Sequence, residues 1–416
     1  MAGSRRAVFV CCDGLGRDWV RPETTPFLDA LRGASLWCAE HSAVFPSVTR
    51  VSAASIATGC LPARHGLHGN RMGLREEGKI VVRDVGAPDF RAHMRRATGG
   101  TLLAPSIAER VAGAGGFIAF SNVSPGAAYF LDPEHFGYIH HRSGSFAPGG
   151  KDIGALAVTH DSAGDRTMTR RFCAEVLCDA RPAVAFLWLC DPDHTLHAVP
   201  LGSPAHTDAL RQADRCVAEV HRTVERLRGE GEEILLLVGS DHGHETIGDS
   251  IDIDDWLAGR GLRDLLEAGD VAVAGQGTSA LLYATDRGSQ RLLGLVEEMR
   301  RTPWAADVLV GVDLAARGFT ADGVVAAVDM ARLAEANPYG VAGRRWAVDE
   351  GKAVPIGCGQ HGGLGPDETR PFLMVDDGGR SSRTLEQATS LTDIAPTISR
   401  FLGLPLAGFD GAPLPL

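Results

Sequence analysis

The chain has 416 residues, of which 44% are hydrophobic, and a formal net charge of −11 at pH 7. This length and apolar content predict one large core with a second, smaller unit, and they exclude a disordered chain or a mini-protein. The acidic balance argues against a broad nucleic-acid-binding surface, because such a surface needs clustered basic residues.

The number of cysteines and the length of the apolar runs indicate the cellular compartment of the protein. There are nine cysteines, an odd number without a CxxC pair, which is typical of a reducing environment. No apolar run reaches the roughly 20 residues of a membrane-spanning helix, and the first strand begins too early for a signal peptide. We therefore expect a cytoplasmic protein without a membrane span.

Predicted strands alternate with predicted helices over the first part of the chain. This alternation is typical of a parallel sheet with helices on both faces, so the predicted fold class is α/β, doubly wound and mostly parallel. In chain order we expect a strand at 7–12, helices near 50–58 and 102–113, a strand near 116–121, a helix at 164–179, a strand at 183–190, a helix near 205–229 and a strand at 234–240.

The pattern changes between about residues 256 and 355. Short strands punctuated by glycine (VAVAG, SALLYAT, VLVGV) are mixed there with helices such as RGSQRLLGLVEEMRR. A strand at 372–376 and the helix LTDIAPTISRFLGL then resume the first pattern. We predict a split catalytic core, 1–255 and 356–416, with a smaller α+β cap inserted at 256–355. The glycine- and histidine-rich residues 122–155 are predicted to form a long loop over the site.

Acidic side chains follow three of the predicted strands. The run AVFVCC ends at Asp13, AVAFLWLC leads into Asp193, and ILLLVGS is followed by Asp241 and His242. Open α/β sheets bind their ligands beyond the carboxyl ends of such strands. We therefore expect these distant residues to meet at one edge of the sheet.

Two further histidines complete a candidate metal site. His197 lies within Asp-His-Thr-Leu-His, so a turn can aim it and Asp193 at one ion, and His361 stands between glycines in GQHGG. Mixed imidazole and carboxylate ligands suit zinc, with manganese as the alternative. A single histidine is more often structural, but four separate blocks favour a metal site. His194 and His244 are predicted to lie outside the ligand set, as supporting or solvent-facing residues.

The segment FPSVTRVSAASIATG predicts a turn that leads into a helix, with Thr49 at or near its first residue. Unpaired N–H groups and the helix dipole favour an anion there, which lowers the cost of ionising a hydroxyl. Thr49 is thus a candidate nucleophile towards phosphorus, although an ordinary N-cap is the alternative. Asn70, beyond a glycine-rich turn, is a candidate amide donor to a phosphoryl oxygen.

These blocks resemble the alkaline phosphatase superfamily and, within it, the nucleotide pyrophosphatase/phosphodiesterase branch that includes the phosphonoacetate hydrolases. VFPSVTRVSAASIATGCLPARHGLHGN resembles the nucleophile region, DPDHTLHAVP the Asp-x-x-x-His block, SDHG the Asp-His-Gly block and GQHGG the final histidine. LTDIAPTISRFLGLP matches a further superfamily feature. The resemblance implies one zinc on Asp193, His197 and His361, a second on Asp13, Asp241, His242 and the Thr49 oxygen, and a phosphoryl-binding role for Asn70.

The function that we expect is metal-dependent hydrolysis of a phosphodiester, pyrophosphate or phosphonate bond, through in-line attack and a covalent phosphothreonine on Thr49 with two zinc ions. The alternatives are a phosphomonoesterase of the same superfamily and a phosphonoacetate-type C–P hydrolase. A catalytically dead phospho-ligand binder is disfavoured because the nucleophile and ligands are chemically competent. We expect a small phosphorylated or phosphonate substrate, no nucleic acid or membrane partner, and a homodimer as the candidate assembly.

Two sequence features bear on related activities. Cys60 begins a Cys-x-Pro-x-Arg pattern of the kind that sulfatases modify, but it follows the Thr-Gly pair that the sulfatase cysteine precedes, so Thr49 takes the equivalent position. Phosphonoacetate hydrolases use lysines after the nucleophile region, and the comparable stretch here has none. The remaining candidates for positive charge or for base stacking in this stretch are His140, His141 and Arg142, and Phe120, Tyr129 and Phe136.

Overall fold

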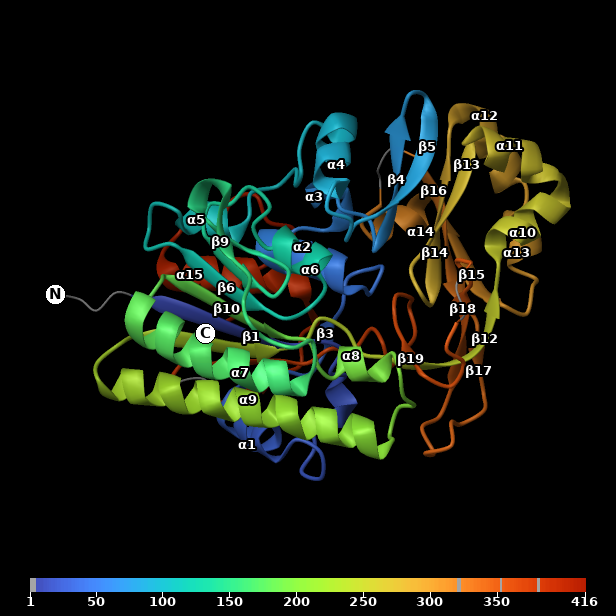
Figure 1. Ribbon diagram of the computed structural model, residues 1–416. Helices are drawn as coiled ribbons and strands as arrows, with labels where there is room; N and C mark the ends of the chain where they lie inside the picture. The colour runs from blue at the N-terminus through green and yellow to red at the C-terminus, as the bar shows by residue number, and fades with distance from the viewer. Residues whose placement is uncertain (1–4, 320–322, 352–353, 380–381) are drawn as a thin grey trace.

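A ten-stranded sheet forms the centre of the molecule in a computed structural model, which describes residues 5–319, 323–351, 354–379 and 382–416 (Figure 1). The central strand β1 pairs in parallel with β11 on one side and β10 on the other, which confirms the predicted mostly parallel α/β sheet. The strands run in the order β21 (Arg383–Leu385), β2 (Leu36–Cys38), β20 (Leu373–Asp376), β11 (Ile234–Gly239), β1 (Arg6–Cys12), β10 (Val184–Leu189), β6 (Phe117–Ser121), β7 (Tyr138–His141), β8 (Ser145–Ala147) and β9 (Lys151–Gly154).

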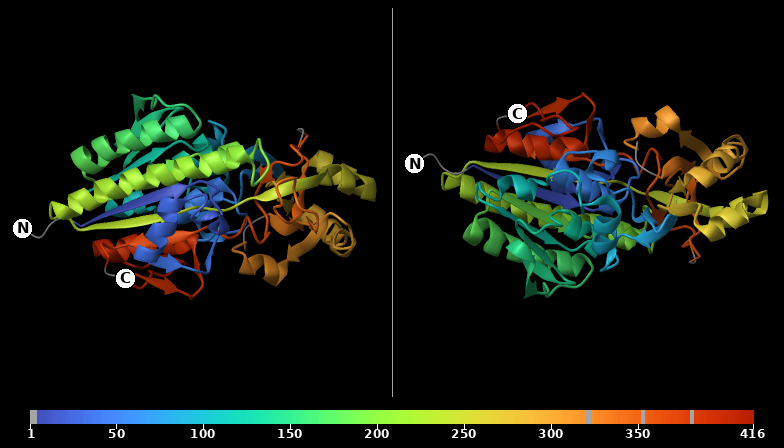
Figure 2. Two further views of the ribbon diagram at one scale, coloured as in Figure 1. Left: turned by 90° about the horizontal axis from the view of Figure 1, so that it is seen from below. Right: turned by 90° about the horizontal axis from the view of Figure 1, so that it is seen from above.

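Helices cover both faces of this sheet (Figure 2). Successive side chains of a strand point to opposite faces, and in β1 both sets are buried: Phe9 and Cys11 belong to one apolar cluster, Val8 and Val10 to the other. The sequence of β1 therefore does not alternate between polar and apolar residues. The first cluster includes α2 (Thr49–Thr58), α5 (Ile107–Val111), α6 (Pro125–Phe130) and α15 (Ile394–Leu402), and the second α1 (Pro26–Ala34), α7 (Ser162–Arg171) and α9 (Pro204–Gly229).

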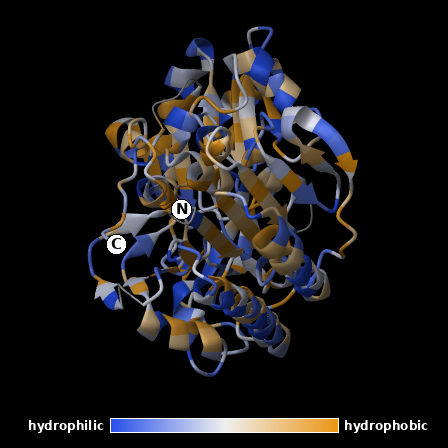
Figure 3. Ribbon diagram, turned by 90° about the vertical axis from the view of Figure 1, so that its left-hand side faces the viewer, coloured by the Kyte–Doolittle hydropathy of each residue, from blue (hydrophilic) through white to orange (hydrophobic). Residues whose placement is uncertain are grey.

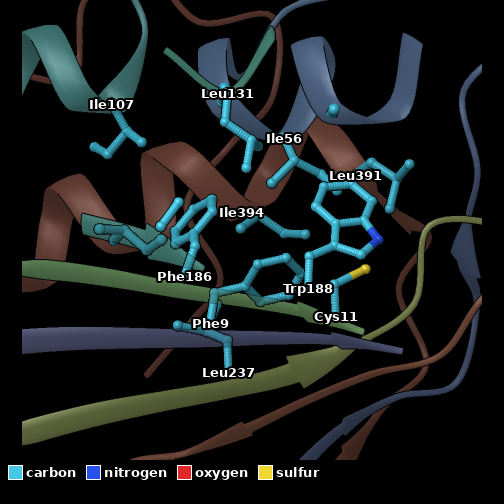
Figure 4. Packing of buried hydrophobic residues seen from close by; sticks show 14 of the residues in the cluster. Phe9, Cys11, Ile56, Ile107, Leu131, Phe186, Trp188, Leu237, Leu391 and Ile394 are labelled. Atoms are coloured by element: carbon cyan, nitrogen blue, oxygen red, sulfur yellow. The ribbon is translucent and has the colours of Figure 1, made fainter. Parts of the chain in front are cut away.

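The packing of the first cluster explains how α2 is held. Ile56 of α2 and Ile394 of α15 lie over Phe9 and Trp188 of the central strands (Figure 4). The central strands are the most continuously hydrophobic part of the chain, while the helices around them mix polar and apolar residues (Figure 3). Burial of this kind contributes about 25 cal/mol per Å² of apolar surface, so α2 is anchored by the same contacts that stabilise the core.

Two smaller sheets lie beyond the carboxyl ends of the central strands (Figure 1). One has a hydrophobic cluster of its own. The division at residues 256 and 355 stays a prediction, and β12, which precedes it, already pairs with β18. The first sheet has the order β13 (Val271–Gly275), β14 (Ser279–Ala284), β16 (Val324–Met330) and β15 (Ala305–Val310), with α10 (Ile253–Leu257), α11 (Arg263–Ala268), α12 (Asp286–Leu293), α13 (Val296–Met299) and α14 (Gly311–Ala316); the second has β17 (Arg332–Leu333), β18 (Arg344–Val348), β12 (Glu245–Ile251) and β19 (Gly359–Gln360).

Shorter elements connect these sheets to the core. The hairpin of β4 and β5 follows the nucleophile segment, and two-residue strands pair near the end of the chain. Among the described residues, no helix has the length and apolar character needed to span a bilayer. The bounds of the connecting elements are α3 (Pro62–His65), β4 (Arg71–Glu76), β5 (Lys79–Asp84), α4 (Phe90–Thr98), α8 (Asp193–Leu196), β3 (His41–Ser42) and β22 (Thr389–Ser390).

The prediction of a long loop at residues 122–155 is wrong. The segment forms α6 and three strands, and β7 pairs in parallel with β6 at the edge of the large sheet. Its polar residues serve the turns between these elements: the Asp132 carboxylate accepts hydrogen bonds from the backbone N–H groups of Phe136 and Gly137. The composition therefore reflects tight turns rather than a free loop.

Other local predictions were imprecise at element ends. The helix expected at 102–113 is limited to α5, because the Ser106 hydroxyl caps it by accepting from the Glu109 N–H. The helix expected at 164–179 continues past α7 as a π-helix, Phe172–Ala180. In VLVGV, β15 ends at Val310 and α14 begins at Gly311.

A buried ion pair ties α9 to the edge of the sheet and generates a prediction about stability. Arg228 Nη1 lies 2.8 Å from Asp376 Oδ2, and both side chains are mostly buried. Burial acts to raise the pKa of Asp376, but His221 and Arg228 outweigh it and hold this pKa below its usual value. A depressed pKa stabilises the fold above the ordinary carboxyl pKa, and this contribution is lost as the pH falls below it.

We predict that Asp376→Asn lowers the free energy of unfolding at pH 7 by about 3 kcal/mol, since it removes the buried charged partner of Arg228, whose other partner, Glu225, is exposed. Chemical denaturation measures this change, and the difference from wild type should shrink as the pH is lowered. Glu230→Gln, in an exposed pair with Arg226, is the control and should cost less than about 1 kcal/mol. Equal effects of the two substitutions would contradict the prediction.

Candidate active site

The three predicted aspartates meet where their strands end. Asp13 follows β1, Asp193 opens α8 just beyond β10, and Asp241 follows β11. The Asp193 N–H donates to the Asp13 carbonyl over 3.1 Å, and the Gly14 N–H donates to Asp241 Oδ1 over 3.1 Å. The carboxyl ends of neighbouring parallel strands thus bring residues that are far apart in sequence into direct contact.

A first group of side chains surrounds Asp193, and we call it the Asp193 cluster. Asp193 Oδ1 lies 3.3 Å from His197 Nε2, 3.0 Å from His244 Nε2 and 3.3 Å from His361 Nε2. One ligand atom of each residue lies within 4.8 Å of those of the others. The sequence predicted three members of this cluster, and His244 is the fourth.

A second group, the Asp13 cluster, contains Asp13, Asp241 and His242, all fully or almost fully buried. His242 Nε2 lies 3.2 Å from Asp241 Oδ2 and 3.6 Å from Asp13 Oδ1. Thr49 reaches the same group, because its Oγ1 lies 3.1 Å from His242 Nε2 and 3.5 Å from Asp13 Oδ1. The two clusters adjoin, with the rings of His242 and His361 stacked at 3.7 Å.

Backbone carbonyls fix the protonation of these imidazoles. His242, His244 and His361 each direct Nδ1 to a carbonyl oxygen, of Gly243 at 3.1 Å, Gly14 at 3.2 Å and Ser47 at 2.8 Å. A carbonyl oxygen can only accept, so each Nδ1 must carry the proton. In the neutral ring the Nε2 lone pair then faces the carboxylates, which is the usual arrangement of metal-binding histidines.

Several buried atoms of the two clusters have no hydrogen-bond partner within the described structure. They are Asp193 Oδ1, Asp241 Oδ2 and His244 Nε2. Asp193 Oδ1 and His244 Nε2 are only 3.0 Å apart, yet they form no hydrogen bond. Buried polar atoms without partners are rare and costly, and carboxylate oxygens facing imidazole lone pairs repel one another. Divalent cations between these atoms would satisfy both groups, so the residues fit a metal centre.

The electrostatics lead to the same conclusion. Burial and the charges of Asp241 and Asp193 raise the pKa of Asp13 well above its ordinary value. Burial also raises the pKa of Asp241 to about 7, against a hydrogen bond from Gly14. Burial lowers the pKa of His242 well below its ordinary value, and the nearby His361 lowers it further. Without a cation the Asp13 cluster therefore disfavours its own ionised carboxylates. In the Asp193 cluster burial acts to raise the pKa of Asp193, but His197 and the other imidazoles outweigh it and hold this pKa well below its ordinary value.

Thr49 is the first residue of α2, and the N-cap position belongs to Val48. The Thr49 hydroxyl therefore faces the Asp13 cluster instead of capping the helix, and the N-cap alternative is wrong. Ser47, two residues earlier, donates its hydroxyl to the Gly363 carbonyl and accepts from the Gly362 N–H. The same short turn thus positions Thr49 on one side and the segment of His361 on the other.

Asn70 shares a cavity of about 250 Å³ with His197 and His361. Its backbone is held on two sides: the N–H donates to Gln276 Oε1 over 2.6 Å, and the carbonyl accepts from Arg50 Nη1 over 2.7 Å. Its side-chain Oδ1 is buried without a hydrogen-bond partner in the part of the chain that the structure describes. The side chain thus lines the cavity with an unpaired amide oxygen, and Arg50 links the position of Asn70 to the helix of Thr49.

Sequence reasoning missed two residues that hold the aspartates of the site, Trp188 and Gly14, and misjudged a third residue, His244. Trp188 donates its indole N–H to Asp13 Oδ2 over 2.9 Å, and Gly14 supplies the N–H that binds Asp241. His244 is not solvent-facing, since its side chain is fully buried in the Asp193 cluster. The signal was its spacing: in an extended segment, residues two apart such as His242 and His244 point to the same side.

The other candidates lie away from this cavity. Phe120 packs in the core against Phe172, the Tyr129 hydroxyl donates to the Gly144 carbonyl, and Phe136 lines a separate cavity. Among His140, His141 and Arg142, the last two bind the backbone of Asn122 and Val123. Cys60 is buried, with its pKa raised mainly by burial, and its Sγ faces two backbone carbonyls. His194 stacks on His160 at 4.1 Å.

Comparison with protein families decides the classification. The family described as type I phosphodiesterase / nucleotide pyrophosphatase matches residues 7–302. The chain belongs to this family. It is therefore a hydrolase of the phosphodiesterase/nucleotide pyrophosphatase type within the alkaline phosphatase superfamily, as the sequence motifs predicted.

Solved structures show the same fold. Murine ectonucleotide pyrophosphatase / phosphodiesterase 5, in an inactive form with AMP, matches with a TM-score of 0.70 at 15% identity, covering 98% of each chain. The human protein of the same name has a TM-score of 0.69 at 16% identity, covering 98% of this chain and 97% of that one. Phosphonoacetate hydrolase from Sinorhizobium meliloti 1021, with phosphonoformate, has a TM-score of 0.66 at 18% identity, covering 97% and 96%. The sequence has no match among curated proteins.

We predict that Trp188→Phe weakens zinc binding by about 10- to 100-fold, the usual cost of removing a hydrogen bond that orients a metal ligand. The aromatic ring keeps most of its packing, while Asp13 Oδ2 loses its N–H donor. Competition with a chelator measures the affinity. Trp256→Phe, a tryptophan that packs on Trp304, is the control, and a similar loss in both variants would contradict the role given to Trp188.

Proposed function

We propose that this protein hydrolyses a phosphodiester, pyrophosphate or phosphonate bond with Thr49 as the nucleophile. The observation that carries the proposal is the place of the Thr49 hydroxyl, at the first turn of a buried helix and 3.1 Å from His242 Nε2. A serine or threonine hydroxyl is a weak nucleophile until a neighbouring base or metal activates it. The Asp13 cluster is the element of this chain that can bind such an activating ion.

We propose two divalent ions as cofactors, zinc with manganese as the alternative, because the ligands are imidazoles and carboxylates without a thiolate. When bound, the ions lower the pKa of the Thr49 hydroxyl and offset the charge of the phosphoryl oxygens. The first ion would be held by Asp193, His197 and His361, and the second by Asp13, Asp241, His242 and the Thr49 oxygen.

The covalent steps take place between Thr49 and the substrate. Thr49 Oγ1 gives up its proton and forms a bond to phosphorus, and the bond from phosphorus to the leaving oxygen or carbon breaks, with its electron pair passing to the leaving atom, which takes up a proton. Water then attacks phosphorus and loses a proton, and the Thr49 Oγ1–P bond breaks with return of a proton to Oγ1. Two in-line displacements give net retention at phosphorus. The first-turn N–H groups of α2 stabilise the negative charge that develops beside them.

Asn70 is proposed to donate its side-chain amide to a phosphoryl oxygen. Its buried side chain lines the same cavity as His197 and His361, and its backbone is fixed by Gln276 and Arg50. A preorganised donor of this kind contributes about 3 to 4 kcal/mol to transition-state stabilisation. Fixing the backbone keeps this donor in place before the substrate arrives.

The cavity favours a small and polar substrate. Its volume of about 250 Å³ is below the usual range for drug-sized ligands. No described residue that lines it is Phe, Tyr or Trp, so it offers no large aromatic side chain for stacking a nucleobase. Arg71 and Glu350 form an ion pair of 3.3 Å at its wall. We propose that the leaving group is small and hydrogen-bonds to this polar wall.

The region at 256–355 is proposed to act as a cap that completes the substrate pocket. Both parts of the chain line the cavity, with Asn70 and His197 from outside this region and Gln276 and Val348 from within it. Among solved relatives, one is described with AMP in an inactive threonine-to-alanine variant and another with phosphonoformate, which supports a threonine-dependent site for small phosphorylated or phosphonate ligands. The homodimer and the cytoplasmic location stay predictions.

We predict that Thr49→Ala lowers kcat by about 10⁴-fold or more, because the covalent route is lost. Zinc content should stay close to that of wild type, since the aspartates and histidines of both clusters remain. Kinetics and metal analysis measure the two quantities, and acid quenching of wild type during turnover should trap phosphate on Thr49. Loss of zinc together with activity would instead indicate a structural role for Thr49.

The class of substrate is tested by a panel on zinc-loaded protein. We predict the highest kcat/KM for a small diester or phosphonate, such as bis-p-nitrophenyl phosphate or phosphonoacetate, and lower values for AMP-containing diesters that the cavity cannot stack. Chelation should abolish activity and zinc should restore it. A preference for p-nitrophenyl phosphate over the diester would favour the phosphomonoesterase alternative.

A further inference from the structure

His244 is a buried histidine with only one satisfied ring nitrogen. Its Nδ1 donates to the Gly14 carbonyl over 3.2 Å, and its Nε2 has no hydrogen-bond partner among the described residues. His65 shows what a purely structural histidine does in this fold: its Nε2 contacts Ser55 Oγ at 3.0 Å, and its Nδ1 accepts from the Leu67 N–H at 3.1 Å. A free nitrogen alone does not identify a ligand, since Nε2 of the buried His41 also has no partner among the described residues. What distinguishes His244 is the carboxylate that its Nε2 faces.

The free nitrogen of His244 points to the same oxygen as two other histidines. Its Nε2 lies 3.0 Å from Asp193 Oδ1, closer than the corresponding atoms of His197 and His361, which are both 3.3 Å away. Asp193 Oδ1 is itself buried without a hydrogen-bond partner in the described structure. An imidazole lone pair and a carboxylate oxygen at this separation repel each other unless a cation lies between them.

The backbone makes room for this ring. A Cβ atom at Gly14 would lie 2.3 Å from His244 Cε1 and 3.0 Å from the Asp193 Cβ, so a side chain at position 14 would expel the imidazole. Gly14 also has a φ of +68°, which disfavours other residues there. The residue that follows Asp13 therefore serves the Asp193 cluster as well, by giving His244 access to it.

We propose that His244 is a fourth protein ligand of the ion at the Asp193 cluster. This inference rests on the proposed function for the presence of that ion. The two metal sites are then unequal, because one has four permanent side-chain ligands and the other has three, Asp13, Asp241 and His242, with the reacting Thr49 hydroxyl as a temporary fourth. Four protein ligands are typical of closed, retained zinc sites, whereas three leave a position open.

The inequality of the sites predicts how the ions leave the protein. The zinc at the Asp193 cluster should persist at chelator concentrations that remove the zinc beside Thr49. The Asp13 cluster, where the nucleophile lies, keeps the open position for the substrate. His244 would thus make the ion at the Asp193 cluster the retained one, while the ion at the Asp13 cluster stays exchangeable. The retained ion would hold His197, His244 and His361 in place.

The test measures zinc per chain in full-length protein dialysed against increasing EDTA. Wild type should lose zinc in two phases, and His244→Gln should release the tightly held zinc at EDTA concentrations about 10- to 100-fold lower. His41→Gln is the control, because His41 is buried, binds Thr389 Oγ1 and lies outside both clusters. Its two phases should match those of wild type. Circular dichroism checks that each variant is folded.

A second measurement needs no variant. X-ray absorption of wild type loaded with one equivalent of zinc should show three imidazoles on the ion, those of His197, His244 and His361. Two imidazoles, or unchanged zinc release in folded His244→Gln, would overturn the assignment of His244 and leave the proposed function intact. Wild type that binds no divalent metal would overturn both.

Discussion

The site depends on one electrostatic constraint, the meeting of three aspartates, two of them buried, and the lone pairs of several imidazoles at one edge of a parallel sheet. Burial and mutual repulsion raise the pKa values of Asp13 and Asp241, so the ionised groups need compensation from cations. This need for cations explains the roles of the neighbouring residues. Trp188 and Gly14 orient carboxylates, while backbone carbonyls turn the imidazoles so that their lone pairs face inward.

The same constraint explains how the nucleophile and the last histidine are joined. His361 donates to the carbonyl of Ser47, and the Ser47 hydroxyl bonds to both Gly362 and Gly363. On its other side, the segment of Gly363 is held by the buried Glu368, which accepts its N–H over 3.0 Å. A ligand that lies more than 300 residues from Thr49 in sequence is thus positioned by the turn that precedes Thr49.

Much of the core could be predicted from sequence because its strands are continuous apolar runs that end at charged residues. Asp13, Asp193 and Asp241 follow such runs, and the parallel topology brings them together. Trp188 could not be assigned in this way, since its contact with Asp13 depends on the register that pairs it with Cys11. The strands within 122–155 were missed because each has only three or four residues, too few for a clear alternation of polar and apolar side chains.

The two chain crossings between the core and the outer sheets lie next to candidate metal ligands. The chain leaves through β12, directly after His244, and returns through β19, directly before His361, and these strands are hydrogen-bonded neighbours with Glu245 opposite Gln360. Because exit and return lie side by side, a tight hairpin could replace the intervening segment without separating the ligands. The scaffold is therefore suited to exchange of its outer module, so that substrate range can diverge, in nature or in the laboratory, while the chemistry is conserved.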